Sequence, residues 1–252
     1  ESSDDNVDYT FKLAYTLNDT TSIYGGVSTG YKATAWNISR DSLPDATEIA
    51  ALALAGTPVG PNTGVGRRYA DPEESEVLEV GAKIKLPTGY LNIALFDQKI
   101  EGFQSNTFIG TGFILANAGS QSTKGYEFDL VMSPTDSIDL AISGLFMDPI
   151  YDSFPNSSSG DLTGTMPSNV SENTVSSTIT WNWNLNNWDG YLRISHLYAS
   201  EAKMLENPAW QAILENAGNG MKTQDTMNFS AGIERDNLSI TIWGKNINDD
   251  KY

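Results

Sequence analysis

Hydrophobic and polar residues alternate one by one along ten stretches of the chain, each about eleven residues long. In the first stretch the apolar positions are Tyr9, Phe11, Leu13, Tyr15 and Leu17, and the polar or small ones are Thr10, Lys12, Ala14 and Thr16. Successive side chains of a β-strand point to opposite faces. The alternation therefore predicts strands with one apolar face and one polar face.

The same pattern recurs along the chain. Its clearest apolar positions are Leu78, Val80, Ala82, Ile84, Leu86, Tyr126, Phe128, Leu130, Met132, Val175, Ile179, Trp181, Trp183, Leu185, Met227, Phe229, Ala231, Ile233, Leu238, Ile240 and Ile242. The stretch around Leu192 is less regular, because Arg193 and His196 fall where both faces look mixed. A membrane-crossing β-strand needs roughly 9–11 tilted residues, which is the length of these stretches.

The segments between the stretches are alternately short and long. The short, turn-forming ones are Asn18–Thr21, Pro87–Gly89, Pro134–Asp136, Asn186–Gly190 and Asp236–Asn237. The long ones are Ala33–Glu74, Gly102–Gly119, Pro149–Glu172 and Ser200–Lys222. Outer-membrane barrels have short periplasmic turns and longer extracellular loops. The pattern predicts an all-β, antiparallel transmembrane barrel wall, in which the first strand runs inward and the tenth, Leu238–Asn248, runs outward.

The composition agrees with a barrel. Only 39% of the 252 residues are hydrophobic, and no run of 18 apolar residues exists, which excludes a transmembrane helix. It does not exclude a barrel, because half of each spanning strand is polar. The 11 Tyr, 9 Phe and 6 Trp can form the aromatic girdles at the membrane interfaces, although core packing and sugar stacking are alternative uses.

The formal charge of −17 argues against a nucleic-acid partner and against attraction to an anionic leaflet. The acidic residues concentrate in predicted loops, at Asp45, Glu48, Asp71 to Glu76, Asp148, Asp152, Asp249 and Asp250. We interpret them as solubilising exposed loops. Bridging by divalent cations to lipopolysaccharide or to a ligand is the alternative, but no spacing matches a calcium-binding loop.

The sequence offers no catalytic constellation. It contains no cysteine, which excludes disulfides, thiolate metal sites and thiol catalysis. Its one histidine, His196, lies in a predicted strand, so we interpret it as a wall residue and predict no metal site and no resident cofactor. The many serines lack a base partner, and the Gly-rich stretch Pro58–Gly66 lacks the Lys-Ser/Thr ending of a phosphate loop. We therefore expect that the protein is not an enzyme.

Two long loops are predicted to contain short helices. In Ala202–Gly220, Asn207 can cap a helix, Pro208 suits its first position and Gly218 can end it. In Ser42–Gly56, Pro44 precedes an apolar run from Ile49 to Ala55. Trp210, Ile213 and Leu214 form an apolar stripe on the first of these helices, which either contacts a ligand or packs on neighbouring loops.

Candidate ligand-binding residues lie in the long loops: Trp36, Arg67, Arg68, Tyr69, Phe108 and Trp210. The paired arginines can hold an anionic ligand through bidentate hydrogen bonds. They can equally neutralise the acidic run from Asp71 to Glu76, which is the interpretation we favour.

Four segments resemble one family in the family's order. They are SIYGGVSTGYK at Ser22–Lys32, PEESEVLEVGAK and IK at Pro72–Lys85, NAGSQSTKGYEFDL at Asn117–Leu130 and WGKNINDDKY at Trp243–Tyr252. Together the chain resembles the C-terminal part of the barrel of a TonB-dependent receptor. The barrels of this family have roughly 22 strands around an N-terminal plug. The resemblance implies that residues 1–252 supply the twelfth to twenty-first strands, that one inward strand follows Tyr252, and that the plug and the TonB-binding box lie elsewhere.

The resemblance also implies a function. Receptors of this family import a scarce solute across the bacterial outer membrane, most often an iron-siderophore complex, with cobalamin and oligosaccharides as alternatives. The implied partners are TonB with its inner-membrane energising complex, the solute, and outer-membrane lipid and lipopolysaccharide. Other readings of the strands are a passive porin or small adhesin barrel, an outer-membrane enzyme and a soluble β-sandwich. The outward final strand and the alternation of loop lengths count against the first and the last of these.

Overall fold

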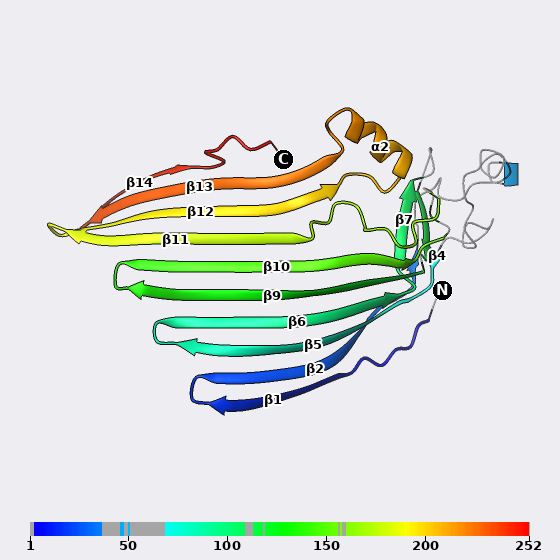
Figure 1. Ribbon diagram of the computed structural model, residues 1–252, viewed down its shortest axis with the longest axis horizontal. Helices are drawn as coiled ribbons and strands as arrows, with labels where there is room; N and C mark the ends of the chain where they lie inside the picture. Colours follow the sequence, from blue (N-terminus) through cyan, green and yellow to red (C-terminus); the bar gives the residue numbers. More distant parts are fainter. Residues whose placement is uncertain are drawn as a thin grey trace.

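The computed structural model describes residues 3–36, 46–47, 50, 69–108, 113–117, 119–155, 157 and 160–251. They form one large antiparallel sheet of ten strands, in which neighbours in the sequence are also neighbours in space (Figure 1). The strands, in order across the sheet, are β1 (Thr10–Asn18), β2 (Thr21–Lys32), β5 (Glu73–Leu86), β6 (Gly89–Glu101), β9 (Ser120–Thr135), β10 (Ile138–Ser153), β11 (Asn173–Leu185), β12 (Trp188–Lys203), β13 (Met221–Arg235) and β14 (Leu238–Gly244).

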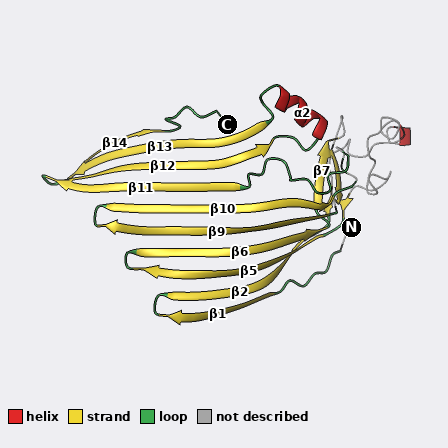
Figure 2. Cartoon of the chain, in the orientation of Figure 1, coloured by secondary structure: helices red, strands yellow, loops and turns green. Residues whose placement is uncertain are grey.

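The two ends of the sheet differ, as the alternation of short and long segments predicts. At one end, which we call the turn end, each hairpin is closed by two residues. In the β11–β12 turn Asn186 and Asn187 have φ angles of 53° and 64°, which suits the right-handed twist of a two-residue hairpin. At the opposite loop end the segments 33–72, 102–119, 154–172 and 204–220 connect the strands (Figure 2).

The loop end carries its own short elements. β3 (Ala35–Trp36) pairs with β4 (Tyr69–Ala70), and β7 (Gln104–Phe108) forms a hairpin with β8 (Phe113–Asn117). The sequence analysis predicted neither of these two strand pairs. The helix α2 (Pro208–Asn216) confirms the predicted helix, because Asn207 Oδ1 accepts hydrogen bonds from the backbone N–H groups at its start. Of the second predicted helix, in 42–56, only residues 46, 47 and 50 are described, and they are helical; the remainder lies outside the described residues.

The sheet has one apolar and one polar face, and the register fixes which residues lie on each. Phe11, Val80 and Ile240 lie on the apolar face and are 59%, 47% and 49% exposed. Lys12 and Glu79 lie on the polar face, where they flank Gly26 of β2, which pairs with Lys12 of β1 on one side and with Glu79 of β5 on the other. Nothing in the described part of the chain covers the apolar face, and an apolar surface of this extent is not stable in water. Hydrocarbon is the solvent that such a face requires.

Charged pairs mark where the apolar face ends. On β5 apolar residues occupy this face from Leu86 to Leu78, and on the next strand Asp97 pairs with Leu78 in the register. The Asp97 carboxylate lies 3.1 Å from Lys124 Nζ. Leu86 and Leu78 are eight residues apart, so at about 3.4 Å per residue the apolar part of β5 is about 27 Å long. A strand tilt of about 40° reduces this to about 21 Å along the membrane normal. This is close to the apolar band of about 25 Å in outer-membrane barrels.

The irregular strand β12 obeys the same division. Arg193 pairs with Ser230 on the polar face, and its Nε donates a hydrogen bond of 3.1 Å to Thr180 Oγ1. His196 pairs with Met227 on the apolar face, and its Nε2 lies 2.6 Å from Asp225 Oδ1. His196 is therefore a residue of the strand wall, as expected.

Several predicted boundaries differ from the structure: β9 includes Pro134, β12 begins at Trp188 within the predicted turn Asn186–Gly190, and β13 begins at Met221. The three largest differences each have a local reason. β10 continues through Pro149 to Ser153, because pairing with β11 ends at Phe146 and the missing N–H of the proline is not needed on that side. β12 continues to Lys203 through a register shift after Ala199. β14 ends at Gly244 and not at Asn248, because Asn246 adopts a φ angle of 49° and turns the chain.

Candidate functional site

The structure brings together two of the six predicted ligand-binding residues. Trp36 and Tyr69 are paired across β3 and β4, and their ring centroids lie 5.2 Å apart at an interplanar angle of 41°. Trp36 is 48% exposed, whereas the neighbouring Ala70 is completely buried. An aromatic pair with an open face is a suitable contact surface for the organic part of a ligand.

Trp210 lies on α2, away from this pair in the sequence and in a different loop. It is 62% exposed and Ile213 is 57% exposed, so the predicted apolar stripe faces outward. The helix is held instead through Gln211, which is 5% exposed. Gln211 Oε1 accepts a hydrogen bond of 3.0 Å from Leu205 N, and its Nε2 donates to Glu215 Oε1 at 2.8 Å.

The remaining candidates are placed only in part. Phe108 is the last residue of β7, but its side chain lies outside the described residues. Arg67 and Arg68 also lie outside them, so whether they bind a ligand or neutralise the acidic run that follows stays a prediction.

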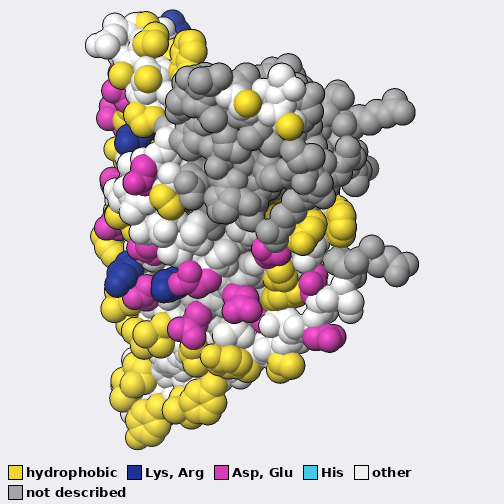
Figure 3. Space-filling model, turned by 90° about the vertical axis from the view of Figure 1, so that its right-hand side faces the viewer, with side chains coloured by type: hydrophobic (Ala, Val, Ile, Leu, Met, Phe, Trp, Pro, Cys, Tyr) yellow, Lys and Arg dark blue, Asp and Glu magenta, His cyan; other side chains and the backbone are white. Residues whose placement is uncertain are grey.

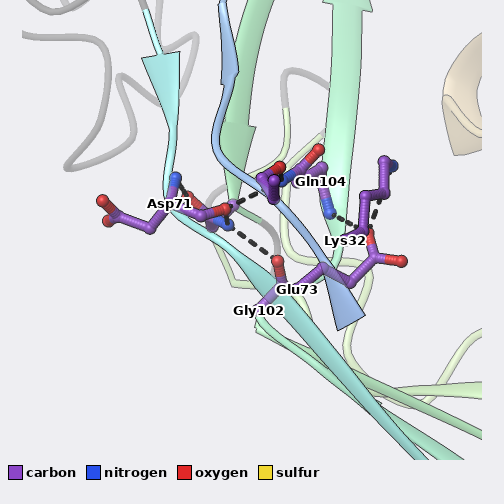
Figure 4. Close-up of polar contacts among 7 residues, drawn as sticks. Lys32, Asp71, Glu73, Gly102 and Gln104 are labelled. Carbon is purple, nitrogen blue, oxygen red and sulfur yellow. Dashed lines mark hydrogen bonds and ion pairs between the residues drawn. The ribbon is translucent and has the colours of Figure 1, made fainter. Parts of the chain in front are cut away.

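Gln104 joins the two loops that carry these residues (Figure 4). Its side chain crosses the base of loop 33–72, where Nε2 donates hydrogen bonds of 2.9 Å to the carbonyl oxygens of Ala33 and Asp71. Its backbone N–H donates to Glu73 Oε2 at 2.9 Å. Glu73 Oε2 also lies 3.4 Å from Lys32 Nζ. Gln104 is therefore connected to the end of β2 and the start of β5, where loop 33–72 joins the sheet.

Asn117 makes the second connection between the same two loops. Its Oδ1 accepts a hydrogen bond of 2.7 Å from Asp71 N, and its Nδ2 donates to the carbonyl oxygens of Asp71 and Gly102 at 2.9 and 2.7 Å. We call the six hydrogen bonds made by Gln104 and Asn117 the loop tie. The resemblance of the segment at Asn117 to a family motif drew attention to this position, whereas nothing in the sequence marked Gln104.

A small apolar core lies at the loop end. Tyr151, Phe154 and Leu162 are each at most 4% exposed, and Phe103 packs against them. The Tyr151 hydroxyl donates a hydrogen bond of 2.5 Å to Glu206 Oε1, which connects loop 204–220 to this core. This core therefore connects segments 102–119, 154–172 and 204–220, and the loop tie adds loop 33–72 to them.

The loops of this end are acidic. Segments 102–119, 154–172 and 204–220 contain four carboxylates, Asp161, Glu172, Glu206 and Glu215, and no Lys, Arg or His. Side-chain and backbone hydrogen bonds from Thr163 hold the pKa of the Asp161 carboxyl below its usual value, so this group is charged at neutral pH. In the view of the loop end, acidic side chains are visible mainly in the lower half of the surface and along its left edge (Figure 3).

The polar face below the loops is hollowed. A hollow of about 320 Å³ lies over β2, β6, β9, β10 and β11, with Tyr24, Glu127 and Ser143 in its lining. Gly81 leaves room there for Tyr24, because a Cβ atom at this position would lie 2.6 Å from the ring in its present orientation. Among the described residues no group of His, Cys, Asp and Glu is arranged to hold a metal ion. No described helix is both long and apolar enough to cross a bilayer.

Together, the bare apolar face, the hollowed polar face and the clustered loops at one end define part of the wall of a membrane β-barrel. Residues 1–247 match the family model described as TonB dependent receptor-like, beta-barrel. The chain therefore belongs to the TonB-dependent receptors, which are outer-membrane transporters and not enzymes.

Solved structures agree on the fold. The ferric yersiniabactin uptake receptor FyuA from Yersinia pestis matches with a TM-score of 0.70 and 17% identity over 96% of this chain and 32% of its own. BauA, the ferric preacinetobactin receptor from Acinetobacter baumannii, matches with a TM-score of 0.66 and 13% identity over 96% and 32% of the two chains. The ferric-catecholate import receptor Fiu from E. coli matches with a TM-score of 0.66 and 13% identity over 97% and 31%.

These matches also show how large a part of such a receptor the chain represents. The chain spans about a third of the length of the solved receptors that it matches. Comparison with curated protein sequences gives no match.

Proposed function

We propose that the protein to which this wall belongs imports a ferric siderophore across the outer membrane, driven by TonB and the inner-membrane energising complex. The observation that carries the proposal is the agreement of the whole ten-stranded sheet with ferric-siderophore receptors. Cobalamin and oligosaccharide are the alternative solutes, and a passive porin is the alternative mode of transport.

The residues of this chain have a physical part in such transport. The apolar face holds the wall in hydrocarbon, and the polar face gives the solute a hydrated path. The hollow lined by Tyr24, Glu127 and Ser143 lies on that path and offers hydroxyl and carboxylate groups to water and to a plug. We expect the plug, the TonB-binding segment and the closing strand to be supplied outside residues 1–252.

Capture of the solute falls to the loop end. Trp36 and Tyr69 present aromatic faces, and Trp210 presents a further one from α2. Aromatic faces gain most from an organic ligand with apolar or cationic surface. Phe108, Arg67 and Arg68 remain candidates in the same two loops.

The charge of the loops favours one kind of ferric complex. Loops 154–172 and 204–220 offer carboxylates and no basic group, and loop 102–119 has no charged residue. Like charges repel within about a Debye length of 8 Å at physiological salt. Uncharged or cationic hydroxamate-type complexes fit this surface better than multiply anionic catecholate-type complexes. Anionic complexes would depend on the arginines of loop 33–72.

Uptake of radioactive iron tests the proposal. A strain lacking the gene is compared with a complemented strain for accumulation of iron supplied on hydroxamate-type, catecholate-type and mixed chelators, with and without TonB. We expect TonB-dependent accumulation of at least one complex, abolished by a protonophore. Accumulation that persists without TonB favours the porin, and growth on cobalamin or an oligosaccharide with no iron uptake would replace the siderophore.

A further inference from the structure

The loop tie joins two loops that are separated in the sequence, and we propose that Gln104 and Asn117 are positioning residues. They hold the Trp36–Tyr69 pair in place and make the bases of loops 33–72 and 102–119 move as one unit. This coupling is independent of the identity of the transported solute.

Gln104 closes the neck of loop 33–72. One hydrogen bond from its Nε2 reaches Ala33 O, where the chain leaves β2, and the other reaches Asp71 O, where the chain returns to β5. The β3–β4 pair that carries Trp36 and Tyr69 lies directly beyond this neck. A single amide nitrogen from the neighbouring loop therefore holds the two arms of loop 33–72 together.

Asn117 holds the same arm from the other end of the β7–β8 hairpin. It bonds both backbone polar groups of Asp71 and also Gly102 O, so each end of loop 102–119 is attached. The two loops approach to backbone contact, because a Cβ atom at Gly102 would lie 2.9 Å from Pro72 O. Gly102 also has a φ angle of 67°, which glycine adopts without strain.

The hydrogen bonds of Gln104 show which of its side-chain atoms hold the loop tie together. The residue is 7% exposed, and among the described residues its Oε1 is the one buried side-chain polar atom without a partner. A buried acceptor without a hydrogen bond destabilises the fold, so the stabilising contribution of this glutamine comes from the two N–H groups of Nε2. Glutamate has the same shape without these donors and is therefore an informative substitution.

Distance measurements between spin labels test the coupling in the full-length receptor in outer membranes. This chain has no cysteine, so Ala35→Cys in β3 and Thr107→Cys in β7 introduce unique labelling sites in it, one on each of the two loops that the tie joins. We expect one narrow distance distribution in the parent. Gln104→Glu and Asn117→Asp should each abolish the narrow peak, and the double variant should broaden the distribution no further, because either change opens the same tie.

The matched control is Asn219→Asp, which removes an exposed hydrogen bond to Ala217 O in loop 204–220. It should leave the distance distribution unchanged, and all variants should keep the heat-modifiable mobility of a folded barrel. An unchanged distribution in Gln104→Glu and Asn117→Asp, or loss of the folded barrel in both, overturns the proposal.

Uptake kinetics separate positioning from a general structural role. With a ferric complex that the parent imports, the tie variants should raise the KM of uptake and leave its maximal rate unchanged. An unchanged KM overturns the positioning role. If the parent imports no ferric complex, the proposed function fails, while the spin-label result still decides the coupling.

Discussion

Replacing Ile93 by lysine tests the central physical claim, that hydrocarbon contacts one face of the sheet. Ile93 lies on the apolar face of β6, 39% exposed, midway between the turn residue Gly89 and the charged Asp97. Four residue steps of about 3.4 Å, reduced by a tilt of about 40°, place it about 10 Å from either edge of the band. A lysine at this depth costs about 2–4 kcal/mol.

The neighbouring residue provides the matched control. Asn92 precedes Ile93 in the same strand and lies on the polar face, between Lys83 and Asp129 in the register. Asn92→Lys adds the same charge at the same depth, but in water, where attraction by Asp129 and repulsion by Lys83 oppose each other. We expect its effect on the free energy of unfolding to be within about 0.5 kcal/mol of zero, as is usual for substitutions at hydrated positions.

Urea unfolding of the receptor in lipid vesicles, followed by the heat-modifiable gel band, measures both variants. Because a difference of about 1.4 kcal/mol is a factor of ten in the folding equilibrium, Ile93→Lys should shift the transition well beyond error. Equal destabilisation by the two lysines, or a larger effect of Asn92→Lys, would falsify the assignment of the two faces.

Three further predictions follow from the packing and the loops. Gly81→Val should lower the free energy of unfolding by about 1–3 kcal/mol, because the new side chain meets the ring of Tyr24. Gly25→Ala should have a smaller effect, because its Cβ atom would lie 3.3 Å from Val80 Cγ1. Urea unfolding of both variants measures the difference. Asn207→Ala should destabilise α2 by about 1 kcal/mol, seen as faster hydrogen exchange of the Ala209 and Trp210 amides, and unchanged exchange would contradict the capping role. Trp36→Ala should raise the KM of iron uptake while the amount of folded receptor in the outer membrane, measured by heat-modifiable mobility, stays constant.

The sequence by itself determined the wall. A period of two in hydrophobicity fixes which side chains share a face, and a slip of one residue would reverse both faces, so the ten strands and their register follow from local pattern. The alternation of two-residue turns with long segments then fixes the direction of each strand. The helix cap at Asn207 was equally predictable, because a cap depends on neighbouring residues alone.

Only the tertiary structure decided what happens at the loop end. The loop tie bonds Gln104 to Ala33 and Asp71, which are 71 and 33 residues away, and no local pattern encodes such a partner. The same holds for α2, whose apolar stripe left open a ligand contact or packing on neighbouring loops. In the structure the buried residue of this helix is Gln211, and Trp210 is exposed. Strand periodicity is a local property that the solvent on each face imposes, but hydrogen bonds between loops depend on which segments the folded wall brings side by side.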